Sequence, residues 1–398
     1  MSAEPLHPAG QWLVALARAL HESGAPAHRL EETVDQNAQA LGVAFACLSQ
    51  PTSLILGIGG ETRVIRVQPH TIHLERLINI DEVGVRVAKG TLSPGAGLAA
   101  LSTIAASPER YGSVMVVFAT AVSSATAAVF LHGSASTVAL AGGLGLGVGI
   151  LARIAVWRIE YGRLHELVAS FVVAATATAL ARVVPVPVGV LTLAGIISLL
   201  PGLSLTVALT ELATRHLASG TARAMGAAVT FLQIGLGTAL GWHLAEALPK
   251  ALRNPNLPLD DGWVWAAVPL AAAAFTVALR ARPRDFPSIA LVAGLSYLAG
   301  RFGQAHLGPE LGASIGGLSV GLLSNLHARI LRVPTAVTQV PGLLLLVPGS
   351  IGFRGFGAML DADVNSGVSA AFSMTVIAGS LVAGILAAGV ILPPRRSL

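Results

Sequence analysis

The sequence predicts a mainly helical, polytopic membrane protein with a small α+β domain at its N-terminus. Of its 398 residues, 54% are hydrophobic and only 11% are charged, against roughly a quarter charged in soluble domains, and the mean hydropathy is +0.72. The 44 glycines suit closely packed transmembrane helices, because small residues let helix backbones approach one another. Charged residues are denser in the first 110 positions than in the apolar segments that follow. These observations divide the chain into a polar domain and a membrane region.

Residues 1–110 have the pattern of an α+β domain facing the cytosol. Residues 11–19 form an amphipathic pattern, and a second helix is predicted over 26–41, because Pro26 suits a first helical turn and Gly42 a C-terminal stop. Three short β-branched runs, separated by turn residues, then predict a strand meander. The runs span 43–50, 52–59 and 62–68, and further helices are predicted over 78–90 and 93–107.

Residues 111–398 contain ten apolar segments, most of them close to the ~20 residues needed to cross a bilayer. We divide them into two sets of five, in 111–250 and 251–398. The seventh segment is the shortest. The segments are 113–131, 134–152, 165–183, 188–209, 223–246, 263–280, 287–300, 310–327, 335–353 and 367–392.

The distribution of arginine and lysine predicts the orientation of these segments. With a cytosolic N-terminus, the inside loops and tail of the membrane region carry twelve basic residues and the outside loops five, which follows the positive-inside bias. The first 20 residues have no basic region ahead of a continuous apolar stretch, so no cleaved signal peptide is expected. We therefore expect a multi-pass protein of the inner or plasma membrane with both termini in the cytoplasm.

Two Pro-Gly pairs interrupt apolar segments at a fixed separation. Pro201-Gly202 and Pro348-Gly349 are 147 positions apart, since 348 minus 201 is 147. The same offset aligns three more dipeptides without a gap: 181–182 with 328–329, 186–187 with 333–334, and 219–220 with 366–367. The repeating unit would contain five helices. Because five is odd, the second copy must enter the membrane from the opposite side, which gives the inverted repeat of many secondary transporters.

The two breaks are the predicted substrate site. A discontinuous helix exposes unpaired backbone groups at membrane depth, which is tolerated only where protein, water or a solute satisfies them. The N-terminus of a half-helix carries a partial positive charge and suits a carboxylate. Hence Pro201, Gly202, Pro348 and Gly349, with Pro341-Gly342 nearby, mark the site. The alternative is a pair of proline kinks that only shape helix packing.

Three stretches resemble the threonine/serine exporter family, in the same order along the chain. They are SGAPAHRLEETVDQNAQALG at 23–42, LSPGAGLAALSTIAASPERYG at 92–112, and LLPGLSLTVALTEL at 199–212 followed by Ser219-Gly220. The resemblance implies a cytosolic domain, ten membrane helices and export of L-threonine or L-serine coupled to the proton motive force, as antiport with protons. The family includes split two-protein relatives that export dicarboxylates such as succinate. Where the family often has Asp after the Pro-Gly helix, this chain has Glu211.

A threonine or serine zwitterion needs a carboxylate receptor, an ammonium partner and a group for its hydroxyl. Ser204, Thr206, Gln233 and Gln339 lie on the broken or neighbouring segments and are the predicted substrate contacts, although Ser and Thr in membrane helices often bond their own backbone. Glu211 is the candidate proton carrier or ammonium partner, because protonation would relieve the cost of burying its charge. It also lies close enough to the end of its segment to be simply interfacial.

Several other classes of function are disfavoured. No basic run with interleaved aromatics indicates nucleic-acid binding, and no cofactor or catalytic residue is expected. The lone Cys47 excludes a disulfide within the chain. His70 and His73 lack further residues spaced to complete a metal site, so we interpret them as part of a solvated loop. One predicted helix face is charged and consists of His28, Glu31, Glu32 and Asp35. We interpret this face as exposed to solvent; the alternative is a regulatory or substrate-collecting role.

Three functions therefore stay open. The first is a secondary exporter of threonine and serine, the second an exporter of small dicarboxylates, and the third a membrane-anchored hydrolase. The hydrolase hypothesis is disfavoured, because residues 1–110 contain no recognisable pair of nucleophile and base. We expect small solutes, protons and lipid as partners, and the sequence leaves homo-oligomerisation open.

Overall fold

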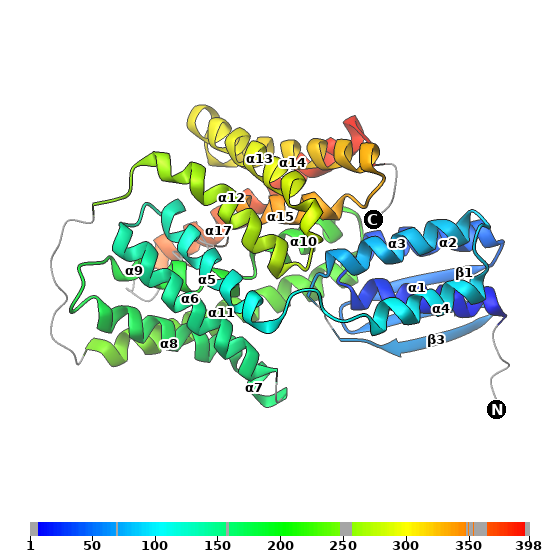
Figure 1. Ribbon diagram of the computed structural model, residues 1–398, viewed down its shortest axis with the longest axis horizontal. Coiled ribbons are helices and arrows are strands. Elements are labelled where there is room, and N and C mark those ends of the chain that lie inside the picture. The colour runs from blue at the N-terminus through cyan, green and yellow to red at the C-terminus, as the bar shows by residue number, and fades with distance from the viewer. Residues whose placement is uncertain are drawn as a thin grey trace.

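The computed structural model describes residues 7–68, 71–156, 159–246, 257–347, 349, 353 and 364–394, without the side chains of residues 159, 160, 245, 246 and 364. An elongated molecule results, with an α+β unit at one end and a helical bundle at the other (Figure 1). We call residues 8–106 the N-terminal unit. Its elements are α1 (Pro8–Glu22), α2 (Ala27–Leu41), β1 (Phe45–Gln50), β2 (Ser53–Ile58), β3 (Glu61–Arg66), α3 (Leu74–Ala88) and α4 (Pro94–Ala106).

The three strands form an antiparallel sheet in the order β1-β2-β3. Phe45 pairs with Ile58 and Ser53 with Arg66, so tight turns connect both pairs of strands. Alternate side chains of β2 are buried, as the period of a strand requires when one face is covered by helices. The core between sheet and helices includes Trp12, Leu13, Leu16, Leu20, Leu30, Leu54 and Leu56. The predicted α+β character of this region is confirmed.

Local signals explain where the helices of the unit begin and end. α2 follows Pro26 and stops at Gly42, whose left-handed conformation (φ 66°) favours glycine. α3 begins four residues before the predicted start, because the imidazole of His73 accepts a hydrogen bond from the amide of Arg76 and caps the helix. His73 is buried rather than solvated, so that part of the prediction is wrong, while His70 lies outside the described residues.

The bundle contains the remaining described helices. Most of the predicted apolar segments coincide with one of them, although the seventh is a helix of 22 residues and not the short segment expected. Its later residues, including Arg301 and Gln304, lower the hydropathy without ending the helix. The elements are α5 (Ser113–Phe130), α6 (Ala135–Ala155), α7 (Ile159–Arg163), α8 (His165–Leu180), α9 (Val188–Gly195), η1 (Ile197–Leu199), α10 (Gly202–Ala213), α11 (Leu217–Glu246), η2 (Asp261–Trp263), α12 (Val264–Ala278), η3 (Pro283–Asp285), α13 (Phe286–Leu307), α14 (Pro309–Leu331), α15 (Ala336–Leu346) and α17 (Val364–Ile391).

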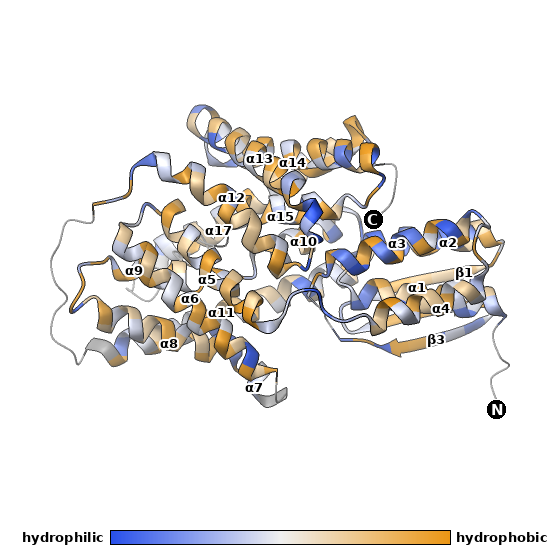
Figure 2. Cartoon of the chain, viewed as in Figure 1, coloured by the Kyte–Doolittle hydropathy of each residue, from blue (hydrophilic) through white to orange (hydrophobic). Residues whose placement is uncertain are grey.

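Hydrophobic residues dominate the bundle, whereas the N-terminal unit is mixed (Figure 2). Among the described residues, five helices are long and apolar enough to cross a membrane, or six if the bent pair α9 and η1–α10 counts as one span. The other predicted spans fall on helices that are shorter or more polar, such as α8 and α15. The bundle is therefore that of a membrane protein, with fewer spans meeting these criteria than the ten predicted.

Helix boundaries in the two halves of the bundle correspond at the offset of 147. Adding 147 to the bounds of α5 (113–130) gives 260–277, beside α12 at 264–278. The same addition takes α6 to 282–302 beside α13, α8 to 312–327 within α14, and α11 to 364–393 over α17. The dipeptide spacing seen in the sequence thus extends to the backbone of nearly the whole bundle.

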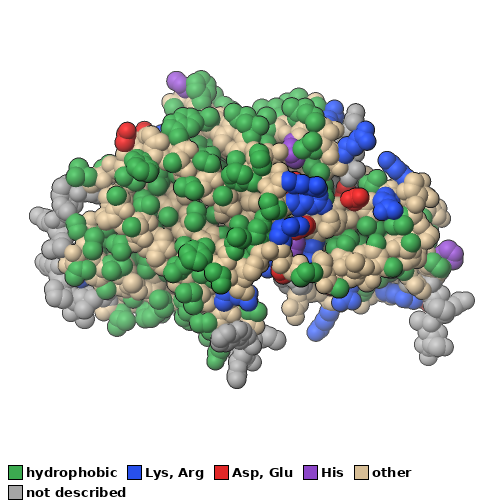
Figure 3. Space-filling model, viewed as in Figure 1, with side chains coloured by type: hydrophobic (Ala, Val, Ile, Leu, Met, Phe, Trp, Pro, Cys, Tyr) green, Lys and Arg blue, Asp and Glu red, His purple; other side chains and the backbone are tan. Residues whose placement is uncertain are grey.

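The N-terminal unit contacts both halves of the bundle. At one junction the amides of Leu74 and Glu75 donate to the carbonyls of Leu279 and Arg280, which follow α12. The carboxylate of Glu109 lies 2.8 to 3.4 Å from Arg280, Arg76 and His73. In Figure 3, basic side chains gather where the unit meets the bundle, while hydrophobic side chains cover much of the visible bundle surface. The second junction, to α10 and α11, belongs to the site described next.

Candidate functional site

The first Pro-Gly pair breaks its helix as predicted. α9 ends at Gly195, a single turn of 3-10 helix follows, and Leu200 is extended (φ −64°, ψ 124°) before α10 starts at Gly202. The two parts of this span differ in direction by 48°. Proline cannot donate the helical hydrogen bond and its ring restricts the preceding residue, so the break falls directly before Pro201.

The second half has a matching interruption. α15 ends at Leu346 and Val347 is extended (φ −67°, ψ 133°), close to the conformation of Leu200, which is its counterpart at the offset of 147. Pro348 lies outside the described residues. Pro341 and Gly342 lie inside α15, and the helix continues through them.

The two interruptions lie against each other. A Cβ atom added at Gly202 would lie 2.1 Å from Cγ1 of Val347 and 3.4 Å from the amide nitrogen of Gly349. A Cβ atom added at Gly349 would lie 3.3 Å from Cβ of Leu200. Only a residue without a side chain permits this approach at Gly202, which explains the glycine after the first proline.

A cavity lies on each side of this contact. The domain-side cavity, about 800 Å³, opens between the N-terminal unit and the ends of α10, α15 and α17. The far-side cavity, about 620 Å³, lies between α5, η1, α12, α13 and α15. Leu203, one residue beyond Gly202, is in both linings. A thin layer of apolar side chains around the two breaks therefore separates two cavities of the size that binds small molecules.

The two broken helices run in opposite directions relative to these cavities. α10 leads away from the contact and ends beside the N-terminal unit, where Thr210 and Thr214 line the domain-side cavity. α15 begins at that same cavity with Thr335 and Ala336, and its last residues line the far-side cavity.

One wall of the domain-side cavity is a hydrogen-bonded cluster joining α2 to the turn after α10. Glu31 accepts from the amide of Ser49 at 2.7 Å and lies 3.2 Å from Nε2 of His216. The other ring nitrogen of His216 lies 3.1 Å from the hydroxyl of Thr214. Burial raises the pKa of the Glu31 carboxyl. Burial, helped by nearby cationic groups, lowers the pKa of His28 to about 3, so this imidazole is neutral at pH 7.

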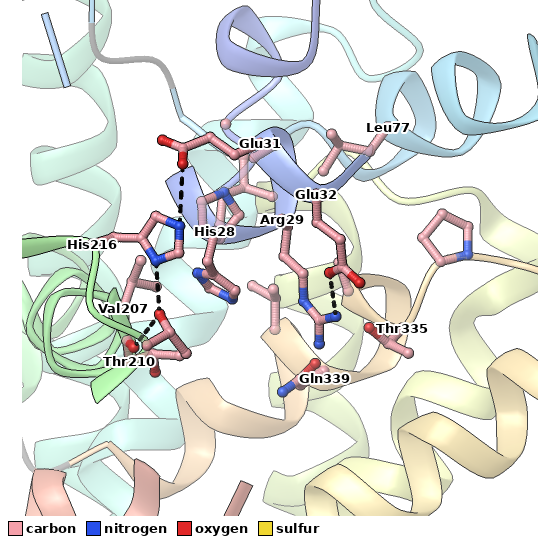
Figure 4. A pocket seen from close by; sticks show the side chains of 18 of the residues that line it. His28, Arg29, Glu31, Glu32, Leu77, Val207, Thr210, His216, Thr335 and Gln339 are labelled. Carbon is pink, nitrogen blue, oxygen red and sulfur yellow. Dashed lines mark hydrogen bonds and ion pairs between the residues drawn. The ribbon is translucent and has the colours of Figure 1, made fainter. Parts of the chain in front are cut away.

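The facing wall holds polar groups that are not hydrogen-bonded to protein. Arg29 points from α2 toward Gln339 of α15 (Figure 4). Its closest carboxylate oxygen, from Glu32, is 3.7 Å away. Within the described part of the chain, neither the guanidinium of Arg29 nor the side-chain amide of Gln339 forms a hydrogen bond. These donors are available to a ligand in the cavity.

Glu211 is fully buried at the second junction. Its Oε1 accepts from the amide of Ala27, the first residue of α2, at 2.9 Å, and its Oε2 accepts from the hydroxyl of Ser219 at 2.9 Å. Arg223 donates to both oxygens, at 3.1 and 3.2 Å. The carboxylate thus caps α2 and neutralises a partly buried arginine.

The far-side cavity carries a different charge. Its lining includes Arg301 and Gln304 of α13, Tyr297, and His132 at the end of α5, with no carboxylate among the described residues. Tyr297 packs against Phe130, with ring centroids 5.4 Å apart. This cavity is therefore basic where the domain-side cavity is rich in acids.

The structure gathers only some of the predicted substrate contacts. Thr206 and Gln339 line the domain-side cavity, and Gly202 and Gly349 line the far-side one. The hydroxyl of Thr206 donates to the carbonyl of Gly202 at 3.1 Å, the backbone bond that the sequence left open. Ser204 lies outside both linings, and Gln233 lies on α11 with its amide 3.5 Å from the carbonyl of Arg163.

The sequence interpretation missed the part that the N-terminal unit plays in the cavity. The helix face expected to be solvated is half-buried at His28 and Glu31, as is the neighbouring Arg29, while Glu32 and Asp35 stay exposed. A helix with a polar face gives no sign that the face will be covered by another domain. The one available signal was that His28 and Glu31 are three residues apart and so share a helix face.

The fold and these cavities define a multi-helix membrane protein built around two broken helices. The chain belongs to the threonine/serine exporter family. A family model described as "Putative threonine/serine exporter" matches residues 11–245, and a second, described as "Threonine/Serine exporter", matches residues 264–391. The family resemblance predicted from the sequence is confirmed, and the family is one of membrane exporters.

Curated relatives are more distant. An uncharacterized protein of Schizosaccharomyces pombe is 26% identical over 92% of this chain and 50% of its own length. Pheromone-regulated membrane protein 10 of Eremothecium gossypii is 25% identical over 86% of this chain and 48% of its own length. The chain thus spans about half the length of these relatives. No solved structure matches the chain.

Proposed function

We propose that the protein is a secondary active exporter of small amino acids, with L-threonine and L-serine as substrates. The observation that carries this proposal is the contact between Gly202 and Gly349, with one cavity on each side. A solute pathway needs access from both sides and a thin barrier that moves between them. Two interrupted helices meeting at the barrier supply the unpaired backbone groups that bind solutes in such proteins.

The mechanism is alternating access between two inverted five-helix repeats, residues 111–250 and 251–398, attached to a cytosolic domain of residues 1–110. The offset of 147 and the opposite directions of α10 and α15 support this arrangement. In the proposal the domain-side cavity opens to the cytoplasm, both termini are cytoplasmic, and the bundle spans the inner or plasma membrane ten times.

The charges in the domain-side cavity favour a substrate with an ammonium group. Setting histidines aside, the lining has one cation, Arg29, and three carboxylates, Glu31, Glu32 and Asp35, so one minus three leaves −2. A dicarboxylate would meet net repulsion there. Export of dicarboxylates stays the second candidate, since Arg301 gives the far-side cavity a cation and the described residues of its lining include no carboxylate.

Glu211 remains the proposed proton carrier. Its four hydrogen-bond donors, including both arms of Arg223, also make it a structural anchor, and the two roles predict different results for Glu211→Gln. The amide keeps an acceptor for Ala27 but cannot exchange a proton. A proton carrier loses the response of transport to the pH gradient, whereas an anchor alone keeps it.

The test is flux of radiolabelled L-threonine and L-serine in proteoliposomes holding the full chain under an imposed pH gradient. We expect saturable, gradient-dependent flux that excess L-serine inhibits and succinate does not. If succinate inhibits the flux and L-serine does not, dicarboxylates replace the amino acids as the proposed substrates. A chain that moves neither class, yet hydrolyses a small amide or ester, would support the hydrolase.

A further inference from the structure

We propose that the N-terminal unit supplies part of the substrate site: Arg29 binds the carboxylate of an α-amino acid inside the domain-side cavity. This inference rests on the proposed function and adds to it a binding residue outside the membrane helices. It assigns the unit a place in the solute pathway rather than a role as a separate domain.

The first support is the unused hydrogen-bonding capacity of Arg29. The side chain is 23% exposed and faces a cavity of about 800 Å³, and among the described residues it pairs with one carboxylate, 3.7 Å away. That distance exceeds the 2.7–2.9 Å of a charge-assisted hydrogen bond. A guanidinium presents its donors in a planar fork that matches a carboxylate, so a partly buried one without hydrogen bonds fits an incoming carboxylate.

The second support is what lies opposite. Gln339 of α15 approaches Arg29 across the cavity (Figure 4), and its amide has no partner within the described residues. Gln339 lies in the first turns of α15, whose N-terminus opens on the same cavity and adds a partial positive charge. The carboxylate would therefore lie between Arg29 and Gln339.

The third support is an acceptor for the ammonium group. Glu31 is already bonded to Ser49 and His216, whereas in the part of the chain that the structure describes Glu32 has only the long contact with Arg29. An amino acid entering between Arg29 and Glu32 would exchange one loose ion pair for two charge-assisted ones. The neutral His28 beside them adds no competing positive charge, and its buried Nδ1 has no hydrogen-bond partner among the described residues.

The test measures binding of L-serine to the full chain in detergent by scintillation proximity. Arg29→Gln is expected to raise the Kd at least tenfold, and Arg29→Lys to raise it less, because lysine keeps the charge but loses the fork. Arg18→Gln is the matched control, since Arg18 is an exposed arginine paired with Glu22 on α1, and it should leave the Kd unchanged. Gln339→Leu, from the opposite wall, should also weaken binding.

Ligand analogues separate direct contact from misfolding. L-serine amide lacks the carboxylate, so Arg29→Gln should not weaken its binding, whereas Glu32→Gln should. A protein damaged by substitution would lose both ligands equally, which would overturn the inference, as would an Arg29→Gln variant with wild-type affinity for L-serine.

Protection of the single cysteine from alkylation tests where the ligand binds. Cys47 lines the domain-side cavity, and burial raises the pKa of its thiol to about 12, so alkylation by N-ethylmaleimide will be slow and easily followed. L-serine should slow it further in the wild type and not in Arg29→Gln. Serine binding without protection of Cys47 would place the site elsewhere and overturn the inference. Absence of serine transport in the wild type would instead count against the proposed function.

Discussion

The backbone amide of Ala27 donates a hydrogen bond to the carboxylate of Glu211, a residue 184 positions further along the chain. Through this bond the N-terminus of α2 is fixed to the end of the first broken span. The carboxylate has no exposed surface, while Glu109, at the centre of the other junction, is 41% exposed. The N-terminal unit therefore meets one half of the bundle at a buried carboxylate and the other half at a partly exposed one.

Removal of the buried contact should destabilise the protein. Glu211→Ala leaves the amide of Ala27 uncapped and Arg223 without its carboxylate. We expect a loss of about 2–4 kcal/mol, somewhat below the usual value for breaking a buried pair because Arg223 is 28% exposed. Thermal unfolding in detergent measures it, with Glu22→Ala as the control, because the Glu22 side chain is 40% exposed and pairs only with its helix neighbour Arg18 among the described residues. Equal midpoints for the two variants would contradict the anchoring role.

The partly exposed ion pairs of Glu109 should behave differently. Glu109→Gln removes the charge that Arg76, Arg280 and His73 share, yet solvent screens exposed pairs, so we expect at most about 1 kcal/mol of stability to be lost. Raising the salt concentration to 1 M should reduce the difference between variant and wild type. A loss as large as that of Glu211→Ala would mean that solvent screens the ion pairs of Glu109 less than their exposure indicates.

The contact between the two breaks should not accept a methyl group. In Gly202→Ala the new carbon would lie 2.1 Å from Cγ1 of Val347, and we expect overpacking to cost about 1–3 kcal/mol and to reduce serine flux. Gly189→Ala is the matched control, because a Cβ atom there meets nothing within 4 Å on the preceding half of the same span. Should the two variants transport alike, the breaks do not form the barrier.

Acid should loosen the α2 junction through His28. Its pKa is about 3 in the folded protein and 6.5 in an unfolded chain, so between these values the unfolded chain binds more protons. Stability contributed by this residue is therefore complete above pH 6.5 and falls as the pH drops toward 3. His28→Gln should flatten the decline of the unfolding midpoint between pH 7.5 and 5. A parallel decline in both proteins would show that other groups titrate instead.

The sequence predicted those features that depend on local pattern or on spacing. Proline and glycine chemistry placed the break before Pro201, the end of α2 at Gly42 and the strand meander, all of which are confirmed. The offset of 147 came from four dipeptides and agrees with helix boundaries over the bundle. Such signals can be read from the sequence because they act within a few residues or recur at a fixed spacing.

The site was only partly predictable, because its wall comes from two regions far apart in the chain. Nothing local at Arg29 shows that α15 will lie opposite, and Glu211 could be read as interfacial because its partner Ala27 belongs to another unit. Gln233 was selected for its cost of burial, yet it lies outside both cavities, with its amide nitrogen 3.5 Å from the carbonyl of Arg163 at the end of α7. These contacts depend on how distant regions of the chain pack together, which the local sequence does not show.

Leu203 belongs to both cavity linings, and this has an electrical consequence. Water that fills both cavities would bring bulk solution close to this residue from each side, so most of the transmembrane voltage would drop across a layer about one side chain thick. A net charge crossing that layer does work of about 2.3 kcal/mol per 100 mV. Under the proposed function, a zwitterion would cross without electrical work, so the voltage would act on the protons proposed to be exchanged for it and not on the amino acid.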